Sequence, residues 1–350
     1  MRNNTHPKQI SLFDFVQNRG VPERERESRI PFHDTFNSII SLENLLISWQ
    51  EFLKGKRKRK DVVRFSIKII DNIIGLHNDL ALKTYRHGFY HAFKINDPKP
   101  RDIHKASVRD RVLHHAIFRI LYPYFEKKFI FDSYSCQVNK GTHKAINRFR
   151  KLSRIVSANN TKACWVLKGD IRKFFANIDH QVLNDILWKY IEDEDVLWLL
   201  GNIIDSFPKG LPLGNVTSQL FINVYMNEFD QFVKRNLKVK NYIRYCDDFV
   251  ILSSDKSYLE ELLPKMSEFL EQKLKLSLHP DKVFIKALSQ GIDFLGWVHF
   301  CHHRVLRTAT KRRMFKRLKE SQSQETLASY LGLLKHGNTH KLVKRILDRD

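Results

Sequence analysis

The chain has 350 residues, of which 61 are Lys or Arg and 38 are Asp or Glu, so its formal net charge is +23. A surplus of this size indicates a polyanionic partner, and nucleic acid is the first candidate. No apolar stretch is long enough to cross a bilayer and the N-terminus lacks the apolar core of a secretory signal, so we expect neither a membrane role nor export.

Residues 1–30 are predicted to form a flexible arm without chemistry, because they are polar, mixed in charge and interrupted by proline and glycine. Apolar side chains at helical spacing predict an amphipathic helix over 41–53. The basic run KGKRKRK at 54–60 ends this helix, and we interpret it as a solvated loop in preference to a phosphate contact. A second helical stretch is predicted over 62–82.

The middle of the chain contains apolar strands that end in acids. Before them, YRHGFYHAFKINDPKPRDIHKASVRDRVLHHAIFRIL has strand-like composition, is broken at Pro98 and Pro100, and then predicts a helix from about Val108. KACWVLKGDI predicts a short strand that ends at Asp170. NYIRYCDDFVILSS predicts a strand pair that bends within YCDD. Carboxylates therefore occur where apolar strands end.

From residue 306 to the C-terminus the pattern is helical, and basic side chains are concentrated at its start. Positive charge in this arrangement is typical of a surface that follows a nucleic-acid backbone. The residues that we select for this role are Arg307, Lys311, Arg312, Arg313 and Lys316.

Asp247 and Asp248 are adjacent within an apolar and aromatic strand pair. Burial of two uncompensated carboxylates costs free energy or raises their pKa values, so we expect a cation beside them. Magnesium suits this position, because it prefers oxygen ligands and is commonly held by one or two carboxylates together with waters and substrate phosphates. The alternative is a solvated turn, since Asp is a common turn former, and these two residues alone leave it open.

Asp170 favours the metal site, because it ends a second apolar strand and precedes the pair Phe174 and Phe175, as if that strand lay beside the first. Three acids would then converge. Two metal ions about 4 Å apart can activate a primer 3′-hydroxyl and stabilise the leaving pyrophosphate oxygen, so the arrangement predicts nucleotidyl transfer. Asp179 precedes a helical run, and we interpret it as a helix N-cap and not as a ligand.

These motifs resemble those of reverse transcriptases and occur in the family's order from about residue 95 onward. LKGDIRKFFANIDH looks like the palm motif with the first metal-binding aspartate, YCDD resembles the YxDD hairpin, and GIDFLGWV is similar to the hydrophobic hairpin that follows. The resemblance implies that Asp170, Asp247 and Asp248 are catalytic and hold the metals. It also implies that Phe175 blocks a ribose 2′-hydroxyl, with plain palm core as an equal interpretation.

KPRDIHKASVRDRVLHHAI resembles the fingers segment, whose basic residues grip the incoming triphosphate. We expect Arg101 and Arg109 in this role, because a guanidinium pairs two phosphate oxygens at once and stabilises charge on the leaving group. Arg111 and Lys99 are second choices that a structural role would also explain. The basic stretch after residue 306 corresponds to the thumb, which would follow the template and primer backbones without reading sequence.

GLPLGNVTSQLFINVYMNEFDQF at 210–232 indicates the branch of the family. Many relatives carry LPQG, whereas this chain has Leu213 before Gly214, and the SQ pair that ends at Gln219 resembles the reverse transcriptases of diversity-generating retroelements. Those enzymes copy an RNA template with errors at adenines. We therefore expect Leu213 and Gln219 at the dNTP site, where the loss of a polar side chain beside the nascent base pair predicts low fidelity.

The expected fold is α+β, a right-hand polymerase with fingers, a palm built on a small antiparallel sheet and a short helical thumb. After the arm at 1–30, we expect N-terminal helices and fingers at 31–160, the palm at 161–300 and the thumb at 301–350. The expected reaction is RNA-directed DNA synthesis, in which dNTPs are added to a primer 3′-hydroxyl with two Mg²⁺ ions, for which Mn²⁺ can substitute.

Partners and location complete the expectations. An RNA template and a DNA or RNA primer are expected, with a non-coding RNA and a small basic accessory protein as further candidates. The four cysteines are widely separated and form no CxxC pair, so we expect no zinc site and a reducing, cytoplasmic setting. The alternatives left open are an antiviral-defence or other bacterial reverse transcriptase, untemplated or protein-primed DNA synthesis, and a non-catalytic RNA-binding protein.

Overall fold

The computed structural model describes residues 35–96, 100–321 and 323–348, so the predicted arm at 1–30, Pro98 and Lys99 lie outside the described residues. The chain divides into two compact units. The first takes its described residues from Met1–Phe129, Lys173–Glu228 and Lys273–Lys275, and the second takes them from Ile130–Arg172, Phe229–Gln272 and Leu276–Asp350. Both units combine helices with antiparallel strands, which confirms the expected α+β class.

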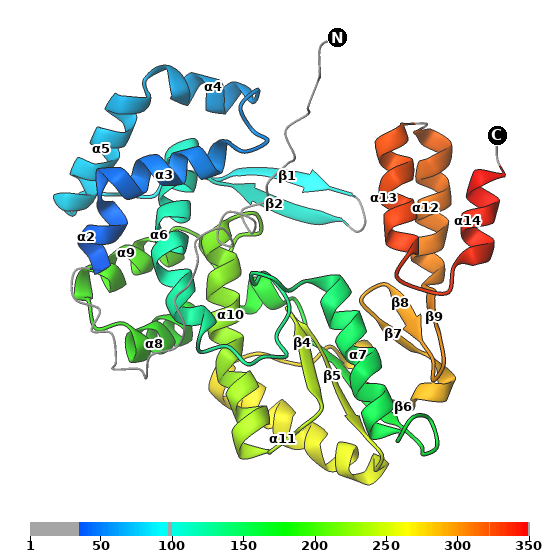
Figure 1. The fold of residues 1–350 in the computed structure, drawn as a ribbon. Helices are drawn as coiled ribbons and strands as arrows, with labels where there is room; N and C mark the ends of the chain where they lie inside the picture. Colours follow the sequence, from blue (N-terminus) through cyan, green and yellow to red (C-terminus); the bar gives the residue numbers. More distant parts are fainter. Residues whose placement is uncertain (1–34, 97–99, 322, 349–350) are drawn as a thin grey trace, which may run out of the picture. The chain divides into compact units, whose positions relative to one another are not determined.

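Helices dominate the first unit (Figure 1). α3 (Leu42–Leu53) begins after Ser41, whose hydroxyl accepts a hydrogen bond from the Asn44 N–H, and it packs against α6 (Val108–Glu126). Asn44 Nδ2 also donates to the Ala116 carbonyl at 3.2 Å and so joins the two helices. Further helices of this unit are α2 (Thr35–Ile40), α4 (Lys60–Ile67), α5 (Ile69–Ala81), α8 (His180–Tyr190), α9 (Glu194–Asp205) and the greater part of α10 (Val216–Gln231).

The predicted helical stretch over 62–82 is two helices instead of one. α4 ends at Ile67 and α5 begins at Ile69, because Lys68 adopts φ −116° and ψ 43°, outside the helical region. Asn72 Nδ2 donates to the Phe65 carbonyl at 2.9 Å and satisfies a backbone group near the break. Apolar spacing continues across the break, so periodicity did not reveal it.

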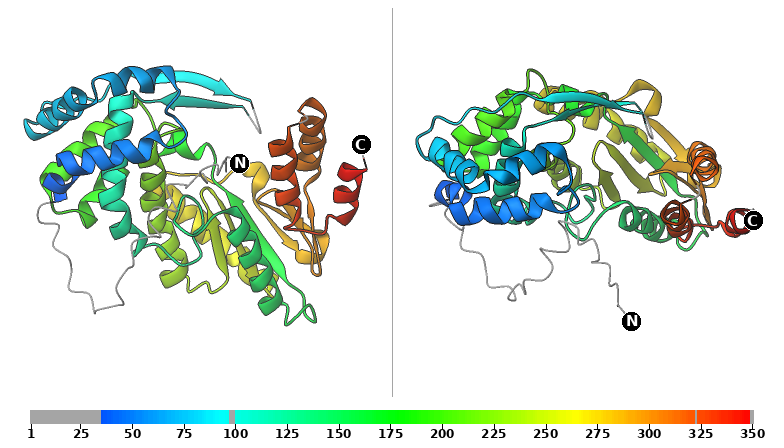
Figure 2. Two further views of the ribbon diagram at one scale, coloured as in Figure 1. Left: turned by 45° about the horizontal axis from the view of Figure 1, so that its top comes forward. Right: turned by 90° about the horizontal axis from the view of Figure 1, so that it is seen from above.

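In the first unit, β1 (His91–Ile95) and β2 (Arg101–Lys105) form an antiparallel ribbon (Figure 2). Phe93 of β1 pairs with Ile103 of β2. The helix expected from about Val108 is confirmed as α6. It begins after Ser107, whose hydroxyl accepts a hydrogen bond from the Asp110 N–H at 3.1 Å. The ribbon therefore leads directly into the helix that packs against α2, α3 and α4.

The second unit is built on a four-stranded antiparallel sheet in the order β4 (Tyr242–Tyr245), β5 (Asp248–Ser253), β3 (Trp165–Asp170), β6 (Phe284–Ala287). The predicted strand that ends at Asp170 is β3, and the predicted strand pair is β4 and β5. α7 (Thr142–Val156) packs on β4 and β5, and α11 (Lys256–Leu274) follows β5 in the chain. The core between helix and sheet includes Phe149, Leu152, Val166, Ile243, Val250 and Leu252.

A three-stranded sheet and three helices complete the second unit (Figures 1 and 2). β7 (Ile292–Phe294), β8 (Trp297–His299) and β9 (Arg304–Leu306) pair in chain order, and α12 (Thr308–Glu320), α13 (Gln324–Leu334) and α14 (His340–Leu347) follow as the predicted helical C-terminus. Trp297 is buried among Leu306, Met314 and Leu334. Gly337 is required beside it, because a Cβ there would lie 2.0 Å from Cζ3 of the indole.

Candidate active site

Three carboxylates lie at one end of the two inner strands of the four-stranded sheet, β3 and β5. β3 and β5 run antiparallel, so the last residue of β3, Asp170, is the cross-strand partner of the first residue of β5, Asp248. A two-residue turn, Cys246–Asp247, joins β4 to β5, and Tyr245 pairs with Asp248 at its base. The Asp170 charge acts on Asp247 as well as on Asp248. The structure thus brings together three acids that are distant in the chain.

A close contact beside Asp170 determines how β3 and β5 align. Gly169 is the cross-strand partner of Phe249, and a Cβ on Gly169 would lie 2.1 Å from Cζ of the Phe249 ring. The ring, which is fully buried, therefore lies across the glycine. Because only glycine leaves room for the ring, this contact favours the register in which Asp170 faces Asp248.

Burial and neighbouring carboxylates destabilise the negative charges of Asp247 and Asp248. Burial raises the pKa of Asp248 to about 6; the Lys168 ammonium opposes the rise, and the Asp247 and Asp170 carboxylates add to it. Burial also raises the pKa of Asp247, and the Asp170 charge again adds to the rise. Asp248 Oδ1 is buried without a hydrogen bond, with Lys168 Nζ 3.5 Å away. A further cation beside these acids would relieve the repulsion between their carboxylates.

Two lysines that the sequence motifs did not single out supply positive charge here. Lys282 Nζ donates to Asp170 Oδ1 at 2.8 Å. Lys168, two residues before Asp170, faces Asp248 and donates to the Asp293 carbonyl at 3.0 Å. The place of Lys168 in LKGD, two residues before Asp170, could have indicated that it lies near the acids. No local pattern connects Lys282 to Asp170, which is 112 residues earlier in the chain.

The donor set fits a hard divalent cation. Carboxylate oxygens are the ligands that Mg²⁺ and Mn²⁺ prefer, and the buried oxygen of Asp248 has no hydrogen-bond donor. Across the described parts of the chain, no three His, Cys, Asp or Glu side chains are arranged to hold an ion by themselves. Mg²⁺ usually completes its coordination with waters and substrate phosphates, so carboxylates at strand ends that leave coordination positions for these ligands are compatible with it.

The arginines expected to bind a triphosphate are in the first unit, and they differ from one another in exposure and in ion pairing. Arg101 is the exposed first residue of β2. Arg109 instead forms an ion pair with Asp79 of α5 and lies over the Tyr85 ring, 5.2 Å from its centroid. Arg111, a second choice, donates to Asp61 at 2.7 Å. Arg101 therefore keeps an accessible guanidinium, while Arg109 and Arg111 are engaged with acids of neighbouring helices.

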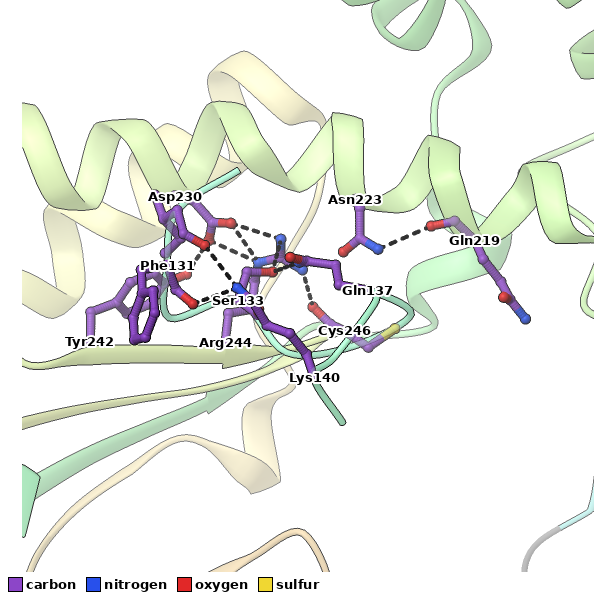
Figure 3. A network of polar contacts seen from close by, with 11 residues as sticks. Phe131, Ser133, Gln137, Lys140, Gln219, Asn223, Asp230, Tyr242, Arg244 and Cys246 are labelled. Atoms are coloured by element: carbon purple, nitrogen blue, oxygen red, sulfur yellow. Dashed lines mark hydrogen bonds and ion pairs between the residues drawn. The ribbon is translucent and has the colours of Figure 1, made fainter. Parts of the chain in front are cut away.

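The other residues expected at a nucleotide site are also in the first unit. Phe175 is half-buried in the short helix η1 (Phe174–Asn177), and its carbonyl accepts from the Leu211 N–H at 2.8 Å. Leu213 is half-buried, and its carbonyl accepts from the His104 N–H at 3.1 Å, which ties the loop before α10 to β2. Gln219 is exposed on the first turns of α10, where its carbonyl accepts from Asn223 Nδ2 at 3.2 Å (Figure 3).

The first unit also contains a basic cavity of about 300 Å³ that the motifs did not reveal. Lys56, Arg59, Lys105 and Arg111 line it, and one carboxylate, Asp61, accepts from both Lys105 and Arg111. Burial and then the Arg59 and Arg111 charges lower the pKa of Lys56. The run KGKRKRK is a loop as expected except for Lys60, which begins α4, but two of its cations line this cavity and are not simply solvated. Gly214 and Gln219 also reach the cavity.

The cations selected at the C-terminal helices lie at the N-cap of α12 and within this helix. Arg307 is its N-cap residue and forms an ion pair with Asp293 at 3.2 Å. Lys316 is exposed and lies 3.8 Å from Glu320 on the next turn. Arg312 is exposed, whereas Lys311 and Arg313 are half-buried on the same helix.

Comparison with known proteins supplies independent findings. A family model described as reverse transcriptase (RNA-dependent DNA polymerase) matches residues 94–299, more than half of the chain. The chain is 27% identical over 281 residues to protein YkfC of Escherichia coli (strain K12), covering 67% of this chain and 72% of YkfC. It is 23% identical over 295 residues to the group II intron-encoded protein LtrA of Lactococcus lactis subsp. cremoris, covering 64% of this chain but 47% of LtrA. Apo telomerase from Candida tropicalis, truncated from its C-terminal domain, aligns with 66% of this chain and 58% of its own at a TM-score of 0.48 and 13% identity.

Proposed function

Because this chain belongs to the reverse transcriptase family of RNA-dependent DNA polymerases, we propose that it copies an RNA template into DNA at the end of the sheet that carries Asp170, Asp247 and Asp248. Family membership confirms the expected enzyme class, RNA-directed DNA polymerase, and the right-hand polymerase fold class. The observation that carries the proposed site is the cross-strand pairing of Asp170 with Asp248 beside the Cys246–Asp247 turn.

In the proposed reaction, the three acids hold two divalent ions, Mg²⁺ or in its place Mn²⁺. Ions of this kind supply the charge that activates a primer 3′-hydroxyl and stabilises the leaving pyrophosphate. The chain contributes carboxylates that are fixed before substrate arrives. Asp170 ends a paired strand, and its carbonyl accepts from the His279 N–H at 2.8 Å, so little reorganisation is needed when the ions bind.

For the incoming dNTP we propose Arg101, Phe175, Leu213 and Gln219 as contacts. Arg101 is the arginine with an exposed guanidinium and would pair with the triphosphate. Arg109 belongs to the same proposal, with the condition that its ion pair with Asp79 opens when the nucleotide binds. In terms of subdomains, we propose helices and fingers to about residue 160, a palm to about 300 and a thumb beyond it.

Primer extension on an RNA template tests the proposal. Asp247→Asn removes one acid at constant size and should abolish metal-dependent incorporation, whereas Asp185→Asn, an exposed change on α8, should leave it unchanged. Equal activity of Asp247→Asn and the unmodified chain would exclude the site. A chain that binds RNA and incorporates nothing under any metal condition would instead be the non-catalytic RNA-binding protein.

A finer proposal concerns the biological branch. We propose error-prone DNA synthesis in a diversity-generating retroelement, which rests on Leu213 and Gln219 within GLPLGNVTSQ. Leu213→Gln should lower the misincorporation rate, measured by sequencing the cDNA, and comparable error spectra for the two proteins would contradict it. For the alternatives, untemplated synthesis would continue without the RNA, and protein-primed synthesis would leave product covalently attached to the chain.

The proposed partners are an RNA template, a primer, a non-coding RNA and a small basic accessory protein, in the cytoplasm. α12 carries Arg312 and Lys316 on its exposed surface, and we propose that this helix contacts the template and primer backbones. Neutralising these two side chains should therefore reduce the slope of log binding constant against log salt concentration by about one for each phosphate contact that is lost. Within the described residues, no helix is both long and apolar enough to cross a bilayer.

A further inference from the structure

The turn that carries Asp247 has a backbone conformation that its residues do not favour. Cys246, the first of the two turn residues, has φ +59°. A two-residue hairpin turn with positive φ at this position normally has glycine there, since a side chain makes the left-handed region costly. Contacts from outside the turn must therefore stabilise the conformation that presents Asp247 and Asp248.

One side chain makes such a contact. Arg244, the third residue of β4, directs Nη1 to the carbonyl oxygen of Cys246 at 3.1 Å (Figure 3). That carbonyl belongs to the residue with the unfavourable φ, and the next residue is Asp247. The guanidinium thus restrains the turn at the peptide that connects it to the first of its two acids.

Arg244 is itself fixed by a buried acid. Arg244 and Asp230, the latter on α10, are both fully buried. Nε donates to Asp230 Oδ1 at 2.8 Å and Nη2 donates to Oδ2 at 2.7 Å, so the two planar groups pair through two parallel bonds. This pairing leaves Nη1 directed at the turn.

The surroundings of the pair restrict it further (Figure 3). Tyr242 donates its hydroxyl to Asp230 Oδ1 at 2.7 Å, and Arg244 Nη2 donates to Ser133 Oγ at 3.0 Å. The Arg244 backbone pairs with the segment beside it, since its N–H donates to the Asp132 carbonyl and its carbonyl accepts from the Tyr134 N–H, each at 3.0 Å. The guanidinium therefore has little freedom to move away from the turn.

We propose that Arg244 and Asp230 are positioning residues for catalysis: the buried pair holds the Cys246–Asp247 turn so that Asp247 and Asp248 face Asp170. The inference deepens the proposed polymerase function and rests on it. Stability alone does not require an arginine here, because a buried ion pair can be replaced by apolar side chains of similar volume without loss of stability. An apolar side chain cannot donate a hydrogen bond to the Cys246 carbonyl, so the contact with the turn is what distinguishes the arginine.

Steady-state primer extension on an RNA template, with melting temperature measured in parallel, separates positioning from stability. Arg244→Lys keeps the charge beside Asp230 but replaces the planar fork by one nitrogen, so it loses the geometry in which Nε and Nη2 pair with the acid while Nη1 reaches the turn. The double variant Arg244→Met with Asp230→Leu replaces the pair by apolar side chains. In both, kcat should fall by about 100-fold, the effect of a small misplacement of reacting groups, while KM for the dNTP changes little. Tyr242→Phe removes one bond to Asp230 and leaves the turn contact, so it should lower the melting temperature and preserve kcat.

A rescue experiment completes the test. Cys246→Gly supplies the residue that the left-handed position favours, so it should raise kcat of Arg244→Lys, an effect that a purely structural role of Arg244 would not produce. Unchanged kcat in a folded Arg244→Lys or double variant, or no rescue by glycine, would overturn the inference. If the unmodified chain incorporates no dNTP, the proposed function fails instead, and the two failures are distinguishable.

Discussion

His299 is a buried histidine whose replacement should make the protein more tolerant of acid. Its side chain is 3% exposed, its ring centroid lies 4.6 Å from that of Phe149, and its Nε2 has no hydrogen-bond partner. Burial, followed by the positive charge of Arg304, lowers the pKa of His299 from 6.5 to about 3. The folded protein therefore keeps this imidazole neutral over a pH range in which the unfolded chain protonates it.

The size and sign of the effect follow from linkage. Above pH 6.5 the histidine is neutral in both states and has no effect on the pH dependence of stability. As the pH falls from 6.5 toward 3, only the unfolded chain binds the proton, so the free energy of unfolding decreases by up to about 1.4 kcal/mol per pH unit. Between pH 8 and pH 5 the loss from this one group is about 2 kcal/mol.

Urea unfolding at pH 8 and at pH 5 measures this loss. His299→Leu removes the titrating group, so the free energy of unfolding of the variant should decrease by about 2 kcal/mol less than that of the unmodified chain between the two pH values. His302→Leu, which replaces an exposed histidine in the loop between β8 and β9 by the same residue, is the matched control. Equal losses for the unmodified chain and His299→Leu would refute the reasoning.

Three further substitutions test other parts of the structure. Gly169→Ala forces a methyl group against the Phe249 ring and should reduce the free energy of unfolding by about 1–3 kcal/mol in urea titration; an unchanged midpoint would contradict the contact. Gly337→Ala introduces the same conflict with Trp297 and should lower the melting temperature; an unchanged melting temperature would contradict this contact. For Asp61, burial alone would raise the pKa, but hydrogen bonds from two cations of the cavity outweigh it and lower the pKa to about 2. The ionised Asp61 therefore stabilises the fold above about pH 4, and this effect is lost as the pH falls toward 2. Asp61→Asn should lower the free energy of unfolding by at most about 1 kcal/mol, because the ion pair is partly exposed. This difference from the unmodified chain should shrink as the pH falls from about 4 to about 2.

The strands of the second unit could be predicted because their sequences carry local signals. Apolar runs stop at Asp170 and bend within YCDD, and these are the points where β3 ends and where β4 turns into β5. The N-cap interpretation of Asp179 is confirmed as well, since its carboxylate accepts from the Val182 N–H at 2.9 Å. Both signals reside within a few residues of the feature that they predict, which is why sequence alone was sufficient.

The surroundings of individual cations could not be predicted in this way. Arg109 lies in a motif that suggests phosphate binding, but its partner is Asp79, 30 residues earlier on another helix. Lys282 lies beside Asp170 only because the chain after α11 returns to the sheet. Charge pairing depends on which surfaces pack together, and a linear pattern contains no information about a contact between segments that are distant in the chain.

The pairing of β3 with β5 has a consequence for how this protein can change over time. Side chains alternate between the two faces of a strand, so one residue inserted or deleted within β3 would turn Asp170 to the opposite face. Substitutions that exchange one apolar residue for another preserve this parity, whereas changes of strand length do not. We therefore expect lineages of this protein to tolerate drift in the composition of β3 and to lose activity through single-codon insertions or deletions, which a deep mutational scan of this strand would reveal.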